Sequence, residues 1–127
     1  MGTIVRETDS PEDLRRNLTT QAMVLDARGE AAAGLQMARR ATRVKESDTA
    51  YEDGFGSRVE ATWMTAVLLT RLGREAQAAH AIQKTTELLM RRAKMLEGED
   101  REGFLSRHPL HVAIQRGAVD TKPGTTW

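Results

Sequence analysis

The chain has 127 residues, the size of one ordinary domain, and its 39% hydrophobic but only 4% aromatic residues imply a core of small aliphatic side chains. Its 19 basic and 18 acidic residues give a net charge of +1, which excludes the long-range positive field by which strongly basic proteins recruit nucleic acid or anionic membranes. The absence of cysteine excludes disulfides, thiolate metal sites and a cysteine nucleophile.

The first predicted helix begins at Ser10, which can cap it, with Pro11 at its first position. Apolar residues then recur along one face and indicate an amphipathic helix; they are Leu14, Leu18, Ala22 and Leu25. Arg15, Arg16 and Asp26 lie away from this stripe. Gly29 ends the helix, and a second one runs to about Lys45. Because almost no loop remains between them, we expect residues 11–46 to form a tight antiparallel hairpin.

Residues 46–56 break the helical periodicity and are interpreted as a loop. Ser57 and Glu60 are spaced as a capping box, which predicts that the third helix starts at Ser57. Gly73 ends that helix as Gly29 ends the first, and a long fourth helix is predicted from about residue 74 to residue 96. Residues 57–97 are therefore expected to form a second hairpin.

A short helix carrying Phe104 is predicted after Gly98, and Pro109 then starts another helix that Gly117 stops. We expect these residues, 99–117, to form a cap that completes a single all-α domain over residues 1–117. Residues 118–127 are expected to be a flexible tail. No strand pattern of any length is present.

The two predicted hairpins are related by an internal repeat. Aligning Gly29 with Gly73 offsets the hairpins by 44 residues and places small residues, Gly34 and Ala78, five positions after each turn. This spacing resembles the tetratricopeptide repeat over residues 14–46 and 58–90. The segments that carry the resemblance best are LDARGEAAAGLQMARRA and LLTRLGREAQAAHAIQKTT. The chain departs from that repeat in its missing aromatic positions, its missing closing proline and its longer period. The resemblance implies a right-handed stack with the first helix of each hairpin on the concave side.

The segment from residue 87 to residue 114 is similar to the final helices of tetratricopeptide regions in bacterial signalling and regulatory proteins, through Arg101, Phe104, Leu105 and Pro109. This likeness implies that the cap closes the last repeat. The excess of arginine over lysine, 15 to 4, also points to a bacterial genome. Because two repeats are few for a stable stack, we expect that either the cap substitutes for a third repeat or the protein pairs with itself or with another helical surface, and a homodimer is favoured over a monomer.

The histidines His108 and His111 are the candidate metal ligands, but Pro109 interrupts their helix and no third ligand completes a site. The carboxylates of residues 97–102 fall in a predicted turn, where solvation and helix capping are expected rather than acid–base catalysis. No serine has a nucleophile-elbow context, and no phosphate-binding fingerprint follows a strand. The sequence therefore predicts no catalytic residue, no metal and no cofactor, and the protein is expected not to be an enzyme.

Two basic runs remain, which are Arg39, Arg40, Arg43 and Lys45, and Arg91, Arg92 and Lys94. The preferred interpretation is a solvated helix face balanced by acids elsewhere, and the alternative is docking on an acidic partner. Nucleic-acid binding is not expected, because interleaved aromatic residues and a basic excess are both absent.

The leading interpretation is a protein–protein interaction module that presents a shallow helical groove to a peptide or helix of a partner. The predicted contact residues are Asn17, Gln21, Arg58, Thr62, Trp63 and Thr65. One alternative is a helical sensor with a small-molecule pocket lined by Trp63, Met64, Leu89 and Met90, and another is a structural homodimerisation unit. We expect a cytoplasmic location without membrane contact, because no signal-peptide run and no stretch of ~18–20 apolar residues is present.

Overall fold

The computed structural model describes residues 10–45, 55–119 and 123. These residues form six helices, α1 (Pro11–Ala27), α2 (Ala31–Thr42), α3 (Phe55–Arg71), α4 (Glu75–Ala93), α5 (Gly98–Ser106) and α6 (Pro109–Arg116). No strand occurs in this part of the chain, so the predicted all-α class is confirmed. Among the described residues, no helix combines the length and the apolarity needed to cross a membrane.

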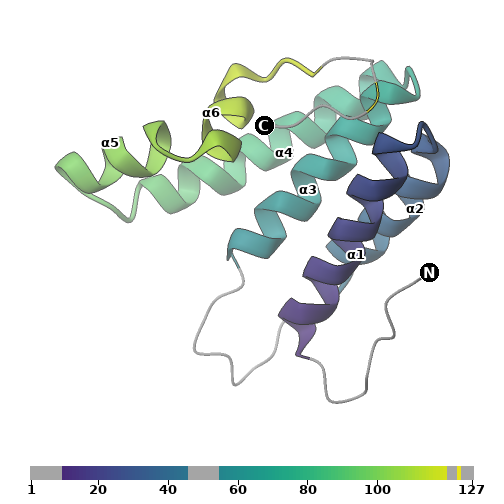
Figure 1. Ribbon diagram of the computed structural model, residues 1–127. Coiled ribbons are helices and arrows are strands. Elements are labelled where there is room, and N and C mark those ends of the chain that lie inside the picture. Colours follow the sequence, from purple (N-terminus) through teal and green to yellow (C-terminus); the bar gives the residue numbers. More distant parts are fainter. Residues whose placement is uncertain (1–9, 46–54, 120–122, 124–127) are drawn as a thin grey trace.

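Both predicted hairpins are present, α1 with α2 and α3 with α4, and they turn in the same way (Figure 1). Glycine adopts the left-handed backbone at each turn, with φ of 77° at Gly29 and 72° at Gly73. The N–H of the next residue then reaches back to the carbonyl of Leu25 at 2.8 Å in the first turn and of Leu69 at 3.0 Å in the second. This is the Schellman motif, which satisfies the last carbonyls of a helix. The repeat in the sequence is therefore also a repeat in backbone geometry.

Gly34 lets α2 approach its neighbours closely, as its place in the repeat predicts. A Cβ atom at this position would lie 3.1 Å from the carbonyl oxygen of Ala22 in α1 and 3.1 Å from Cδ2 of Leu68 in α3. Its counterpart Ala78 is 5% exposed near the start of α4. Small residues at these two positions therefore permit the close helix packing on which a core poor in aromatic residues depends.

Two of the predicted helix starts are confirmed and one is wrong. The hydroxyl of Ser10 accepts a hydrogen bond from the N–H of Asp13 at 3.1 Å, and prolines occupy the first turns of α1 and α6. The third helix, however, begins at Phe55 rather than at Ser57. Ser57 does not cap it, because its side chain is turned inward and accepts a hydrogen bond from Nη1 of Arg15 at 2.9 Å. Residues 46–54 of the predicted loop lie outside the described residues.

The core is centred on α3, which packs against α1, α2 and α4. Its side chains Trp63, Met64 and Leu68 are all 2% exposed or less. The predicted cap is present, since α5 and α6 fold back along α4 and Ile114 of α6 joins the core at 1% exposure (Figure 1). Val119 packs against this core as well.

Two charged residues of α1 that lie away from its apolar stripe are buried against the second hairpin. Arg15 donates hydrogen bonds to the hydroxyl of Ser57 and, at 3.1 Å, to the carbonyl of Val44. Asp26 accepts two hydrogen bonds from Arg71, from Nε at 2.9 Å and from Nη2 at 3.3 Å. The first helix is therefore covered by both α2 and α3, and α3 contributes to the contacts of this polar edge and of Leu18 on the apolar stripe.

Candidate functional site

A groove of about 780 Å³ runs along α3 between α2 and α4. One stripe of α3 forms its floor, consisting of Arg58, Thr62, Thr65 and Leu69. One wall comes from α2 and the other from α4; their charged side chains are Arg39, Arg43, Lys84, Glu87 and Arg91. We refer to this site as the basic groove. Its volume falls in the range of about 300–1,000 Å³ that is usual for ligand sites in proteins.

Three of the six predicted contact residues, Arg58, Thr62 and Thr65, line the basic groove. From the sequence, the first helix of each hairpin is expected to line the binding surface, whereas the walls of the basic groove are the second helices of the two hairpins. Both α2 and α4 pack on α3 but not closely on each other, and this leaves a stripe of α3 uncovered between them.

The two threonines on the floor present hydrogen-bond acceptors. The Thr62 hydroxyl donates to the carbonyl of Arg58 at 2.9 Å, and the Thr65 hydroxyl donates to the carbonyl of Ala61 at 3.0 Å. Each hydroxyl proton is therefore used within α3, while the oxygen lone pairs can still accept a hydrogen bond. A bound segment could place backbone N–H groups against these two oxygens.

The charge in the groove is strongly one-sided. Among the residues that the structure describes, five arginine and lysine side chains line it against one carboxylate, that of Glu87. Arg39 donates a hydrogen bond to Oε1 of Gln77 at 3.1 Å and so bridges α2 and α4. Arg43, Lys84 and Arg91 are exposed, and within the described part of the chain no carboxylate lies within ion-pair distance of them.

The two basic runs of the sequence contribute to this groove only in part. Arg39 and Arg43 come from the first run and Arg91 from the second, whereas Lys84 belongs to neither. The neighbouring Arg92 lies over the ring of Phe55 instead, 5.2 Å from its centroid. The sequence signal for the α4 wall is a helical spacing of polar residues at 77, 80, 84, 87 and 91, which periodicity alone assigns to an ordinary solvated face.

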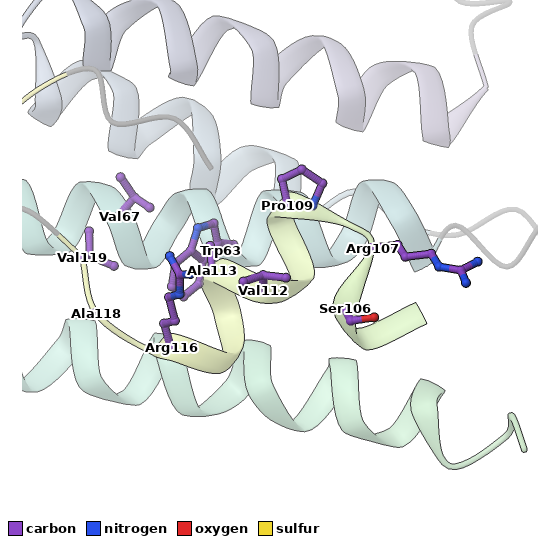
Figure 2. Close-up of a pocket in the computed structure, with 10 residues that line it drawn as sticks. All are labelled: Trp63, Val67, Ser106, Arg107, Pro109, Val112, Ala113, Arg116, Ala118 and Val119. Carbon is purple, nitrogen blue, oxygen red and sulfur yellow. The ribbon is translucent and has the colours of Figure 1, made fainter. Parts of the chain in front are cut away.

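Another face of α3 borders a second cavity, of about 480 Å³, which we call the Trp63 cavity (Figure 2). It lies between α3 and the cap and is lined mainly by apolar side chains, among them Trp63, Val67, Val112, Ala113 and Val119. Arg107 and Arg116 line it as well. Trp63 therefore does not share a site with the other predicted contact residues of α3.

The side chains expected around the pocket of a helical sensor differ in their burial and do not all line one of the cavities described here. Met64 and Leu89 are at most 1% exposed within the core, while Met90 is 38% exposed on the surface of α4. Of the four side chains expected in that pocket, only Trp63 lines the Trp63 cavity. The Trp63 cavity instead forms where the cap packs against α3.

The remaining predicted contact residues, Asn17 and Gln21, lie on α1 and are hydrogen-bonded to each other, from Nε2 of Gln21 to Oδ1 of Asn17 at 3.2 Å. They line neither the basic groove nor the Trp63 cavity. The structure therefore does not bring them together with Arg58 and the threonines.

The first helices of the two hairpins meet at a third cavity, of about 710 Å³, which we call the Glu60 cavity. Arg16 of α1, Glu60 of α3 and the cap histidines His108 and His111 are among its lining residues. Burial raises the pKa of the Glu60 carboxyl above its ordinary value, and the positive charge of Arg16 partly opposes this effect. Burial likewise lowers the pKa of His111, although the hydrogen bond to the Phe104 carbonyl acts in the opposite direction.

We expect Glu60→Gln to raise the melting temperature at pH 7. Because the pKa of Glu60 is higher in the folded than in the unfolded state, its ionised form opposes folding, and this penalty disappears as the pH falls through the folded-state pKa. The gain over the unsubstituted protein should therefore vanish at about pH 4. Thermal unfolding followed by circular dichroism tests this. Glu102→Gln, at an exposed position of α5, is the control, and an unchanged or lower melting temperature for Glu60→Gln at pH 7 would contradict the expectation.

The histidine pair belongs to an aromatic cluster. The rings of His108 and His111 lie 4.6 Å apart, and that of His111 lies 4.4 Å from Phe104. Nδ1 of His111 is 2.7 Å from the carbonyl oxygen of Phe104 and donates to it. Among residues 10–45, 55–119 and 123, no group of three or more histidine or carboxylate side chains is placed to hold a metal ion. The acids Glu97, Glu99, Asp100 and Glu102 are exposed at the start of α5.

These features define an all-α protein of two hairpins with matching turns, closed by a two-helix cap and grooved along its central helix. Comparisons of the chain with protein-family models, with curated proteins and with solved structures find no match. The function must therefore follow from the geometry and charge of the chain itself.

Proposed function

We propose that this protein is an interaction module that binds a peptide segment of another protein in the basic groove. The observation that carries the proposal is the groove itself, with its open floor of Arg58, Thr62, Thr65 and Leu69 between two helical walls. Cationic side chains on both walls can set the orientation of a bound segment, and the apolar side chains between them can bury part of it.

The helical architecture supports the same proposal. Two hairpins with the same turn, 44 residues apart, are compatible with a helical-repeat protein. Such proteins use extended surfaces formed by neighbouring hairpins to bind their partners. We propose tetratricopeptide-like kinship on this basis, with the difference that the proposed binding surface lies between the second helices of the hairpins.

The test is to select ligands from an unbiased library of random peptides and to measure their affinity by fluorescence polarisation. Thr65→Trp fills the floor of the groove without changing its charge, so we expect it to weaken the selected peptides at least about tenfold. Gln36→Trp, at an exposed position of α2 that does not line the groove, should leave their affinity unchanged. Circular dichroism should give the same helix content for both variants.

Two outcomes would count against peptide binding in the basic groove. One is a library that yields no ligand, and the other is a set of ligands whose affinity Thr65→Trp leaves unchanged. The second candidate function, binding of a small molecule, is favoured by the apolar Trp63 cavity. It predicts a rise in melting temperature with small ligands that is the same in Thr65→Trp and in the unsubstituted protein.

A further inference from the structure

We infer that the occupant of the basic groove is an extended acidic peptide, in which carboxylates alternate with apolar side chains. This inference rests on the proposed function and specifies the chemistry of the partner. Among the described residues, the groove gathers five permanent cations, and Glu87 is the one carboxylate that lines it with them, in a chain that carries almost equal numbers of both charges.

The cations most available to a partner lie on opposite walls. Arg43 stands at the end of α2, while Lys84 and Arg91 lie on α4, two turns apart on the same face. All three are exposed, and none is neutralised by a carboxylate of the described residues. Like charges gathered in one cleft repel one another and focus a positive potential in it, so an anionic ligand is attracted and relieves the repulsion.

The groove is not uniformly polar, and this defines the rest of the ligand. Leu88, which is half-buried, lines it between the cations and offers apolar surface, whereas Leu69 and Ala81 are only 3% and 8% exposed. Thr62 and Thr65 present oxygens whose protons are already used within α3, so they suit the N–H groups of an extended backbone. Side chains of an extended strand alternate in direction, and such a strand can place apolar residues on this floor while its carboxylates reach the walls.

The dimensions favour a short peptide. The floor runs from Arg58 to Leu69, eleven steps along the helix and about 16.5 Å at 1.5 Å per step. An extended peptide of about five or six residues has that length. A nucleic acid would also be attracted by the cations, but no aromatic side chain of residues 10–45 and 55–119 lines the groove, where a base could stack on it.

The probe is the fluorescein-labelled hexapeptide Glu-Leu-Glu-Leu-Glu-Glu, in which glutamates alternate with two leucines over the first five positions, titrated with the full chain. We expect saturable binding that weakens at least about tenfold between about 50 and about 500 mM salt. Replacing the four glutamates by glutamines should abolish binding. A nonspecific attraction to the whole surface would not distinguish between arginines, so matched charge reversals are the decisive comparison.

Arg43→Glu combined with Arg91→Glu should weaken the acidic peptide at least about tenfold, since both walls then repel it. Arg28→Glu combined with Arg40→Glu makes the same change in net charge at exposed positions outside the groove, and should change the affinity less than about threefold. Equal weakening by the two double variants, or equal binding of the glutamine peptide, would overturn the inference. Circular dichroism on both variants confirms that they are folded.

Other occupants give different results. If a single-stranded oligonucleotide of equal charge binds more tightly than the peptide, the occupant of the groove is a nucleic acid and not a peptide. If light scattering shows a dimer that dissociates in the Arg43→Glu, Arg91→Glu variant, the occupant of the groove is a second copy of this chain. If library-selected peptides bind and are lost in Thr65→Trp but are unaffected by the charge reversal, the proposed function stands and the acidic occupant is wrong. If neither library nor acidic peptides bind, both fail.

Discussion

Asp26→Ala is expected to lower the free energy of unfolding by about 3–5 kcal/mol. The carboxylate of Asp26 and the guanidinium of Arg71 form an ion pair joined by two hydrogen bonds, and both side chains are at most 3% exposed. Removing the carboxylate leaves the cation in a site that water scarcely reaches, and this desolvation cost dominates the result. Because a domain of this size is stable by only about 5–15 kcal/mol, the loss should be evident in urea unfolding followed by circular dichroism.

Two further variants separate the burial of charge from the loss of an ion pair as such. Arg16→Ala removes the ion pair between Arg16 and Glu12, which also joins a guanidinium to a carboxylate, at 3.1 Å, but whose Arg16 side chain is 63% exposed. This variant should lower the free energy of unfolding by less than about 1 kcal/mol. Asp26→Leu combined with Arg71→Met removes both buried charges and should recover most of the stability lost in Asp26→Ala. A loss below about 1 kcal/mol for Asp26→Ala would show that Arg71 is readily solvated.

Leu68→Ala is expected to destabilise the protein by about 2–5 kcal/mol. Leu68 is 0% exposed and lies where α3 meets the first hairpin, so truncation loses buried apolar surface and leaves a cavity between the hairpins. The free energy of unfolding in urea measures this directly. A cost below about 1 kcal/mol would mean that the neighbouring helices close the space.

The same substitution should change the effect of Gly34→Ala. In the unsubstituted protein, the gain in helix propensity from alanine is opposed by the approach of the new Cβ to Cδ2 of Leu68. Once Leu68 is truncated, that contact is gone and only the Ala22 carbonyl remains equally near, so Gly34→Ala becomes more favourable. We expect a coupling free energy of about 0.5 kcal/mol or more in a double-mutant cycle. Leu89→Ala, also at a position 0% exposed but absent from the surroundings of Gly34, should give additive effects.

Most of the helical architecture could be predicted from local sequence. Ser10 with Pro11, Pro109 and the glycines at 29, 73 and 117 act on backbone within a few residues of themselves, and each marks a helix end as expected. The start of α3 could not be predicted in this way. The side chain of Ser57 would suit a helix cap, but its hydroxyl accepts a hydrogen bond from Arg15, which is distant in sequence.

The candidate site could be predicted only in fragments. Arg58, Thr62 and Thr65 follow from the helical spacing of polar residues on α3, and they do lie together. Trp63 is adjacent to Thr62 in sequence but faces a different cavity, and Asn17 with Gln21 lies apart from both. Which faces of neighbouring helices remain uncovered depends on how the hairpins pack, and periodicity within one helix does not contain that information.

Caps, turns and amphipathic spacing are short-range effects, so the all-α class, the two hairpins with their glycine turns, the cap and one polar stripe of the central helix could be predicted from the residues alone. The buried pair of Asp26 with Arg71, and the groove that Arg43 and Arg91 both line, result from the packing of the helices and could not be predicted from the sequence. Electrostatic interactions depend on distances in space and on solvent exposure, and both are set only when helices far apart in the chain pack together.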